Sequence, residues 1–303
     1  MDLSLESKPF LKRLAERISE EALAGKQLLV VLPNRRSQFV LQAFLNENLH
    51  DETRVQLRTV DQLMESLSDL KMIEPEELLV AFYSAYSKLE KSPQSFDQFT
   101  AWAVSFLTDA NDVDLHLGDM DALLKQINEY HQTGEYFKDG TPGPIERDYI
   151  TFWQRLPRYY KALREELGQL KLAYRGLIYR KVAESAVGKN ELLDASFRDK
   201  TTFWVGVIPG NPSEQKLLHW IREHHDLAVF ADVDQFYINH QAHEAGKLFR
   251  SGAFAKETLW QVNLLQRKAY QFDVHALPNT IGQLLKVKDL LTEIPKEDFS
   301  KTV

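Results

Sequence analysis

One segment near the start of the chain constrains the fold more than any other. It opens with an unbroken apolar run at 28–32 and continues with a polar turn at 33–37. The apolar residues that follow at helical spacing are Phe39, Val40, Leu41, Phe44 and Leu45. The run predicts a buried strand, and the spacing predicts an amphipathic helix. Strand, polar turn and helix in this order are typical of α/β folds that offer backbone amides and basic side chains to a phosphate.

The polar turn carries two neighbouring cations, Arg35 and Arg36, between Asn34 and Ser37. Two arginines at the carboxyl end of a strand, beside the start of a helix, suit the phosphate backbone of a nucleic acid. An equally open alternative is a solvated first helical turn, in which Asn34 or Ser37 serves as the cap.

Length and composition exclude several classes of protein. The chain has 303 residues, enough for one large or two moderate domains, and its 44% hydrophobic and 27% charged composition is that of an ordinary globular protein. The net charge of −7 argues against a nucleic-acid binder that is basic overall. It still allows a basic groove on an acidic body, because only the charge that lines the groove acts on the phosphates.

The compartment is expected to be the cytoplasm. The chain has no cysteine, which excludes disulfides, thiolate metal sites and cysteine nucleophiles, and which fits a reducing environment. Its acidic start lacks the features of a signal peptide, and no run of about 18 apolar residues is present. We therefore expect no membrane span.

The order of the expected elements favours an α/β fold. The strands are expected at 27–32, 55–60, 202–208, 227–231 and 270–276. The helices are expected at 6–24, at 36–48, after a cap at Thr59 or Asp61, and at 75–90, 95–109, 119–131, 146–186 (interrupted near Gly168), 213–225 and 279–293. Because the strands are confined to the two ends, a parallel sheet with a large all-helical insertion is expected. The expected domains are a discontinuous α/β domain at 1–70 and 195–303 and a helical insertion at 71–194.

Other patterns favour ordinary structural interpretations. Gly25 and Lys26 stand between helix and strand, the inverse of a phosphate loop, so Gly25 is expected to end a helix. The acidic run at 109–114 lacks the glycine and glutamate of a calcium loop and is expected to be a solvated turn with capping aspartates. The pattern H-x-x-H-E at 240–244 matches no zinc motif and is expected in a surface loop.

Aromatic residues alternate with arginines later in the chain. The aromatic residues are Trp153, Tyr159, Tyr160, Tyr174 and Tyr179, and the arginines are Arg155, Arg158, Arg164 and Arg175. Such a set can stack bases. A packed helical face with solvated arginines is the favoured interpretation.

Several segments together resemble one family. They are Leu-Pro-Asn-Arg-Arg at 32–36, Thr-Val-Asp-Gln-Leu at 59–63, Ser-Phe-Asp-Gln-Phe at 95–99 with the acidic run at 109–114, Tyr-Arg-Gly-Leu-Ile-Tyr-Arg at 174–180, and the segments at 205–214, 232–237 and 243–248. In this order they resemble the AddB-like helicase-nuclease proteins of bacterial double-strand-break repair, which carry a PD-(D/E)XK nuclease. The resemblance implies a P-loop-NTPase-like parallel sheet of the superfamily 1 helicase type.

The resemblance also implies DNA-contacting residues. The segment at 28–37 looks like motif Ia of UvrD-type helicases, which touches single-stranded DNA, and 58–61 stands where the next DNA-contacting turn would lie. The candidate DNA-binding residues are Asn34, Arg35, Arg36, Ser37, Arg58 and Thr59.

The sequence departs from the helicase pattern in both halves of the ATP site. No phosphate loop is present, and the strand at 202–208, which stands in the place of Walker B, ends without a carboxylate. Ala231 replaces the glycine of the following sensor motif. We expect no catalytic residue, cofactor or metal site in this chain. We expect it to be the N-terminal part of a longer PD-(D/E)XK nuclease whose nuclease domain lies elsewhere.

Two roles remain open. In the first, the chain is a DNA-binding scaffold in double-strand-break repair and recombination, acting on single-stranded DNA or a duplex end beside a helicase-nuclease partner subunit. In the second, it is a protein-interaction module that docks a motor subunit without contacting DNA.

We predict that the purified chain does not hydrolyse ATP. Phosphoryl transfer depends on a lysine that cradles the phosphates and a carboxylate that holds magnesium, and the sequence lacks both motifs. Phosphate release is measured with magnesium, with and without DNA, and a magnesium-free reaction is the control. Magnesium-dependent, DNA-stimulated turnover would contradict the prediction.

Overall fold

The computed structural model describes residues 8–49, 53–132, 143–206, 210–250, 260–263, 265 and 273–295. The chain divides into two compact units, Met1–Val262 and Asn263–Val303. The first unit contains the sheet and most of the helices. Of the second, the structure describes α14 (Thr280–Glu293), which Asn279 caps by accepting a hydrogen bond from Gly282 N at 2.8 Å.

A four-stranded parallel sheet organises the first unit, in the order β2-β1-β5-β6. The strands are β1 (Gln27–Leu32), β2 (Val55–Thr59), β5 (Lys200–Val205) and β6 (Leu227–Phe230). Each neighbouring pair runs parallel. The expected α/β fold with a parallel sheet is therefore confirmed.

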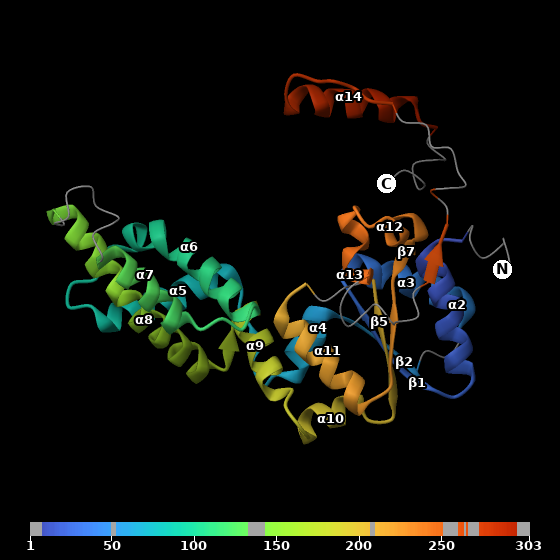
Figure 1. The fold of residues 1–303 in the computed structure, drawn as a ribbon, viewed down its shortest axis with the longest axis horizontal. Coiled ribbons are helices and arrows are strands. Elements are labelled where there is room, and N and C mark those ends of the chain that lie inside the picture. The colour runs from blue at the N-terminus through green and yellow to red at the C-terminus, as the bar shows by residue number, and fades with distance from the viewer. Residues whose placement is uncertain are drawn as a thin grey trace. The chain divides into compact units, whose positions relative to one another are not determined.

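Helices cover both faces of this sheet, as Figure 1 shows. Leu28, Val30 and Leu32 of β1 pack in one core with α2 (Phe10–Leu23) and α3 (Arg35–Asn48). Leu29 and Val31 pack in a second core with α4 (Val60–Leu67) and α11 (Pro212–His224). Successive side chains of a strand point to opposite faces, so one continuous apolar run supplies both cores.

A long segment between α4 and β5 leaves the sheet and returns to it. Its helices are α5 (Pro75–Leu89), α6 (Phe96–Leu115), α7 (Met120–Gln132), α8 (Pro144–Leu170), α9 (Arg175–Ser185) and α10 (Glu191–Phe197). The outgoing and returning chains pair in parallel through β3 (Lys71–Met72) and β4 (Leu172–Ala173). The described part of the segment is thus helical except for this short pair. The division into domains stays a prediction.

Aromatic rings fill the core of the inserted helices. Phe82 lies 5.0 Å from Phe99 and 5.3 Å from Phe106, measured between ring centroids. The rings of Tyr86 and Tyr159 lie 5.2 Å apart at a steep angle. Edge-to-face and offset pairs of this kind stabilise a core beyond the area that they bury.

The expected packing of the aromatic residues near 153–179 is correct, and Arg155, Arg158 and Arg164 are exposed as expected, whereas Arg175 is partly buried. Tyr159, Tyr160, Tyr174 and Tyr179 are all buried. Arg155 pairs with Glu90 at 3.3 Å. Arg175 pairs with Asp61 at 2.7 Å. These arginines therefore join elements together rather than only face water.

The acidic run at 109–114 is not a solvated turn. It forms the last turns of α6, which continues to Leu115, and Asp114 is fully buried. Its carboxylate accepts hydrogen bonds from Tyr160 Oη at 2.8 Å, from Arg180 Nε at 2.6 Å and from Tyr174 Oη. Three partners, one from α8, one from α9 and one from the residue that precedes α9, compensate for the loss of solvation, which explains why a carboxylate is tolerated there.

Both tyrosines stay protonated donors to this carboxylate at neutral pH. Burial and the adjacent Asp114 raise the pKa of Tyr160 to about 12 and that of Tyr174 well above its ordinary value. Desolvation disfavours a charged phenolate, and a neighbouring carboxylate disfavours it further.

The break expected near Gly168 in the long helix at 146–186 is present: α8 ends at Leu170, Lys171 has φ of 54°, and α9 begins at Arg175. Other boundaries differ from expectation. The strand expected at 270–276 lies partly outside the described residues, and 273–276 contain no strand. A parallel pair of β7 (Asp232–Asp234) with β8 (Trp260–Val262), and the short helices α12 (Gln235–Asn239), η1 (Glu244–Gly246) and α13 (Lys247–Arg250), were not expected.

Two smaller expectations are met. Gly25 follows the last residues of α2 with φ of 96°, a left-handed conformation that ends a helix at little cost for glycine. Residues 240–243 lie between α12 and η1, Glu244 begins η1, and His240 and Glu244 are exposed. Within the described ranges, no group of three or more His, Asp or Glu side chains can hold a metal ion. Over those same ranges, no helix has the length and apolar character that crossing a membrane requires.

Replacing Asp114 with alanine is expected to destabilise the fold by about 3 kcal/mol or more, because Arg180 Nε and the hydroxyls of two buried tyrosines lose this acceptor. Asp114→Asn keeps one acceptor oxygen and should fall between the wild type and Asp114→Ala. Denaturant unfolding gives the free energies.

The matched control is Asp109→Ala, an exposed aspartate on the same helix, which should change stability by less than about 0.5 kcal/mol. Equal stability of Asp114→Ala and this control would show that the buried network contributes nothing.

Candidate functional site

The two segments that carry the candidate residues meet at one edge of the sheet. The parallel register sets Val31 opposite Arg58 and Leu32 opposite Thr59. The turn after β1 and the turn after β2 therefore leave the sheet side by side at its carboxyl edge. Ligands of open parallel α/β sheets gather at this edge.

In the turn after β1, Asn34 caps the following helix and the two arginines are exposed. Asn34 caps α3, because its Oδ1 accepts from Ser37 N at 2.9 Å and from Ser37 Oγ at 3.1 Å. Arg35 and Arg36 occupy the first positions of the helix with exposed side chains. Among the described residues, neither guanidinium has a hydrogen-bond or ion-pair partner. Two unneutralised cations thus face outward from the end of β1.

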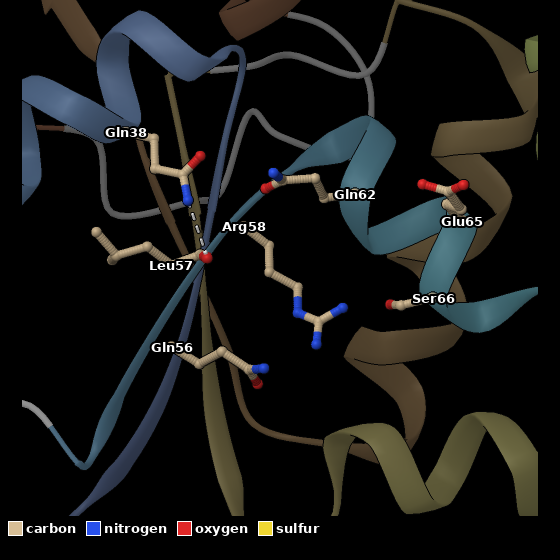
Figure 2. Close-up of a pocket in the computed structure, with 7 residues that line it drawn as sticks. All are labelled: Gln38, Gln56, Leu57, Arg58, Gln62, Glu65 and Ser66. Carbon is tan, nitrogen blue, oxygen red and sulfur yellow. Dashed lines mark hydrogen bonds between the residues drawn. The ribbon is translucent and has the colours of Figure 1, made fainter. Parts of the chain in front are cut away.

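In the turn after β2, Thr59 is likewise a capping residue, and Arg58 is partly exposed. Thr59 is buried and forms a capping box with Gln62: Thr59 N donates to Gln62 Oε1 at 2.9 Å, and Gln62 N donates to Thr59 Oγ1 at 3.2 Å. Its hydroxyl is therefore occupied by α4, and Asp61 lies in the first turn rather than at the cap. Arg58 is partly exposed and projects from β2 toward α4 (Figure 2).

A hollow of about 480 Å³ lies beside Arg58, and its lining is mostly polar. The lining residues, drawn in Figure 2, are Gln38, Gln56, Leu57, Arg58, Gln62, Glu65 and Ser66. Gln38 Nε2 donates to Leu57 O at 3.2 Å, which ties α3 to β2 across the hollow. Glu65 Oε1 accepts from Met72 N at 2.9 Å. Amides, a hydroxyl and a guanidinium suit recognition of phosphate, sugar or base edges.

A second cluster at the same edge was missed by the sequence analysis. Arg175 of α9 donates from Nε to Asp61 Oδ1 at 2.7 Å and from its Nη2 to Tyr179 Oη at 3.0 Å. Tyr179 Oη also donates to Asp61 Oδ1 at 2.5 Å. The guanidinium carbon lies 4.5 Å from the centroid of the Tyr179 ring. The returning helix of the inserted segment is thereby fixed to the first turn of α4.

A buried carboxylate, Glu214, completes this cluster from α11. It accepts from Asn211 Nδ2 at 2.8 Å and from Gly210 N at 3.2 Å, and it lies 4.0 Å from Arg175 Nη2. Burial raises its pKa despite these donors. Asn211 in turn accepts from Glu214 N at 2.9 Å, so the sequence signal that could have found it is the capping pattern N-x-x-E.

The cluster places two carboxylates near the sheet edge with a protein cation between them. Asp61 and Glu214 both face Arg175. The strand at 200–205 carries no acidic residue, and the first carboxylate after it in the sequence is Glu214, the third residue of α11. Because Arg175 already supplies positive charge there, the arrangement suits a structural bridge better than a metal-dependent reaction.

A largely apolar hollow of about 570 Å³ lies at the carboxyl ends of β1, β5 and β6. Pro33, Gly206 and Ala231 line it beside Asp232, whose pKa burial raises and which lies 3.6 Å from Arg13. Among the described residues, its lining includes no lysine or arginine. Such a lining does not complement a triphosphate.

No model of a protein family matches the chain, and a comparison with curated proteins gives no match.

The raised pKa of Glu214 predicts a pH-dependent stability that a glutamine variant lacks. An unfolded glutamate ionises near 4.5, whereas the buried Glu214 ionises at higher pH. The stability that this group contributes is complete below pH 4.5 and falls as the pH rises through the folded pKa. Glu214→Gln should therefore gain stability relative to the wild type over this interval and then hold a constant difference.

Thermal or denaturant unfolding at a series of pH values measures this difference. The control is Leu192→Ala on α10, an exposed substitution that removes no titratable group and whose difference from the wild type should not depend on pH. A difference for Glu214→Gln that stays flat, or that falls with rising pH, would contradict the assignment.

Proposed function

We propose that this chain is a DNA-binding scaffold that holds the DNA backbone at the carboxyl edge of its parallel sheet. The observation that carries the proposal is the pair of exposed, unneutralised guanidinium groups of Arg35 and Arg36 at the end of β1, beside Arg58 at the end of β2. Contacts to phosphates carry no sequence information, so binding without sequence preference is expected.

We further propose that the fold is of the P-loop-NTPase type found in superfamily 1 helicases, in an AddB-like protein of double-strand-break repair and recombination. Two features support this: the order of the matching sequence segments, and a parallel sheet whose second and third strands along the chain are separated by a long helical segment. In this proposal the full-length protein carries a PD-(D/E)XK nuclease, and the present chain positions its DNA.

The proposal includes the loss of ATPase activity. The apolar lining of the hollow at the ends of β1 and β5 and the bridge from Arg175 to Asp61 and Glu214 support it, because neither offers a place for a magnesium-bound triphosphate. The chain contributes binding and position in this scheme, and the chemistry lies in other parts of the protein or in a partner subunit.

The second role, docking of a motor subunit without DNA contact, draws support from the net charge of −7. It predicts no salt-dependent binding of DNA. The same titration therefore separates the two roles.

Replacing both Arg35 and Arg36 with alanine is expected to weaken the binding of every single-stranded sequence alike. It should also lower the slope of log affinity against log salt by roughly one to two units, since each phosphate contact contributes about 0.7 for single strands. Fluorescence anisotropy with an unstructured oligonucleotide at several salt concentrations measures both quantities.

The matched control removes two exposed cations from elsewhere, Arg147→Ala with Lys161→Ala on α8. It changes the net charge equally and should leave the slope unchanged. If the double variant at 35 and 36 behaves like this control, the two arginines belong to a solvated helix turn.

A further inference from the structure

Phe39 is 77% exposed, although the sequence pattern sets it among the apolar positions of α3. The helix buries Leu41 and Leu45 against the sheet instead. A large aromatic ring in water gains nothing for folding. Phe39 lies on the same helix as the candidate cations Arg35 and Arg36.

The ring of Phe39 lies on the same face of α3 as several polar residues. Arg35, Phe39, Gln42 and Asn46 follow one another at intervals of four, three and four residues, which sets them in one row along a helix. Gln42 Nε2 donates to Asn46 Oδ1 at 2.9 Å, so the two amides are held together. We call this row the α3 stripe.

The α3 stripe contains no carboxylate. The first acidic residue of the helix is Glu47, whose carboxylate lies 4.0 Å from Lys12 Nζ. Arg36, three residues before Phe39, adds a second cation next to the ring. Cation, aromatic ring and amides are the groups with which proteins bind single-stranded nucleic acids, because the cation neutralises a phosphate and the ring stacks on a base.

We infer that Phe39 is a stacking platform for an unpaired base, and that the α3 stripe therefore selects single-stranded nucleic acid over duplex. This deepens the proposed function and rests on it. In a duplex the flat faces of the bases are covered by their neighbours, so an isolated ring on a helix surface cannot reach them. In a single strand they are accessible while the phosphates reach Arg35 and Arg36.

The experiment compares two oligonucleotides of equal length and charge, one of thymidines and one with abasic sites, by fluorescence anisotropy. Phe39→Ala should weaken binding of the thymidine oligonucleotide about tenfold, which lies within the range measured for one stacked base. Because no charge is removed, the salt slope should not change. Binding of the abasic oligonucleotide should be the same for the variant and the wild type.

Two further variants sharpen the test. Phe39→Tyr keeps the ring and should bind the thymidine oligonucleotide like the wild type. Leu192→Ala removes another strongly exposed apolar side chain, 84% exposed on α10, and should have no effect. Circular dichroism checks that the variants fold, which the exposure of both positions leads us to expect.

The results distinguish a failure of the stacking platform from a failure of the proposed DNA-binding scaffold. Salt-dependent binding that needs Arg35 and Arg36 but not Phe39 overturns the stacking platform and leaves the scaffold in place. An equal loss on both oligonucleotides also overturns it, since the ring then acts without a base. Failure of the wild type to bind either oligonucleotide overturns the scaffold and the platform together and favours a protein partner for the exposed ring.

Discussion

The arrangement of the first unit depends on two ion pairs made by one short helix. Arg175 at the start of α9 pairs with Asp61 of α4 at 2.7 Å, and Arg180 one and a half turns later pairs with Asp114 of α6 at 2.6 Å. The first pair joins the inserted helices to the sheet edge, and the second joins them to one another. The carboxyl edge of the sheet, where the candidate residues lie, and the inserted helices are therefore both fixed to α9.

Close backbone approach makes this element specific. Gly176, between the two arginines, donates from N to Asn111 Oδ1 at 2.8 Å, and a Cβ added there would lie 2.2 Å from Asn111 O. Only glycine allows α9 and α6 to come this near. The stretch from 174 to 180 thus combines two buried tyrosines, two buried aliphatic residues, two paired arginines and a close-contact glycine, so each of its residues has a structural role.

The sheet was largely predictable from the sequence, because apolar runs such as 28–32 are buried on both faces and leave an unambiguous signal. The candidate site was less predictable from the sequence. Asp114 was expected in a solvated turn, because its partners Tyr160, Tyr174 and Arg180 lie 46 to 66 residues away along the chain. No local sequence pattern indicates contacts at that separation. The exposure of Phe39 was hidden for another reason: α3 carries more apolar residues than one buried face can hold, and the pattern does not say which is left out.

The two initial interpretations of the turn at 34–37 are parts of one arrangement. Asn34 caps α3 by accepting from Ser37, and Thr59 caps α4, so three of the six candidate residues act on the protein itself. Because these caps fix where α3 and α4 begin, the side chains of Arg35, Arg36 and Arg58 leave the sheet edge from defined backbone positions. The capping residues set the geometry, and the arginines supply the charge that a nucleic acid would meet.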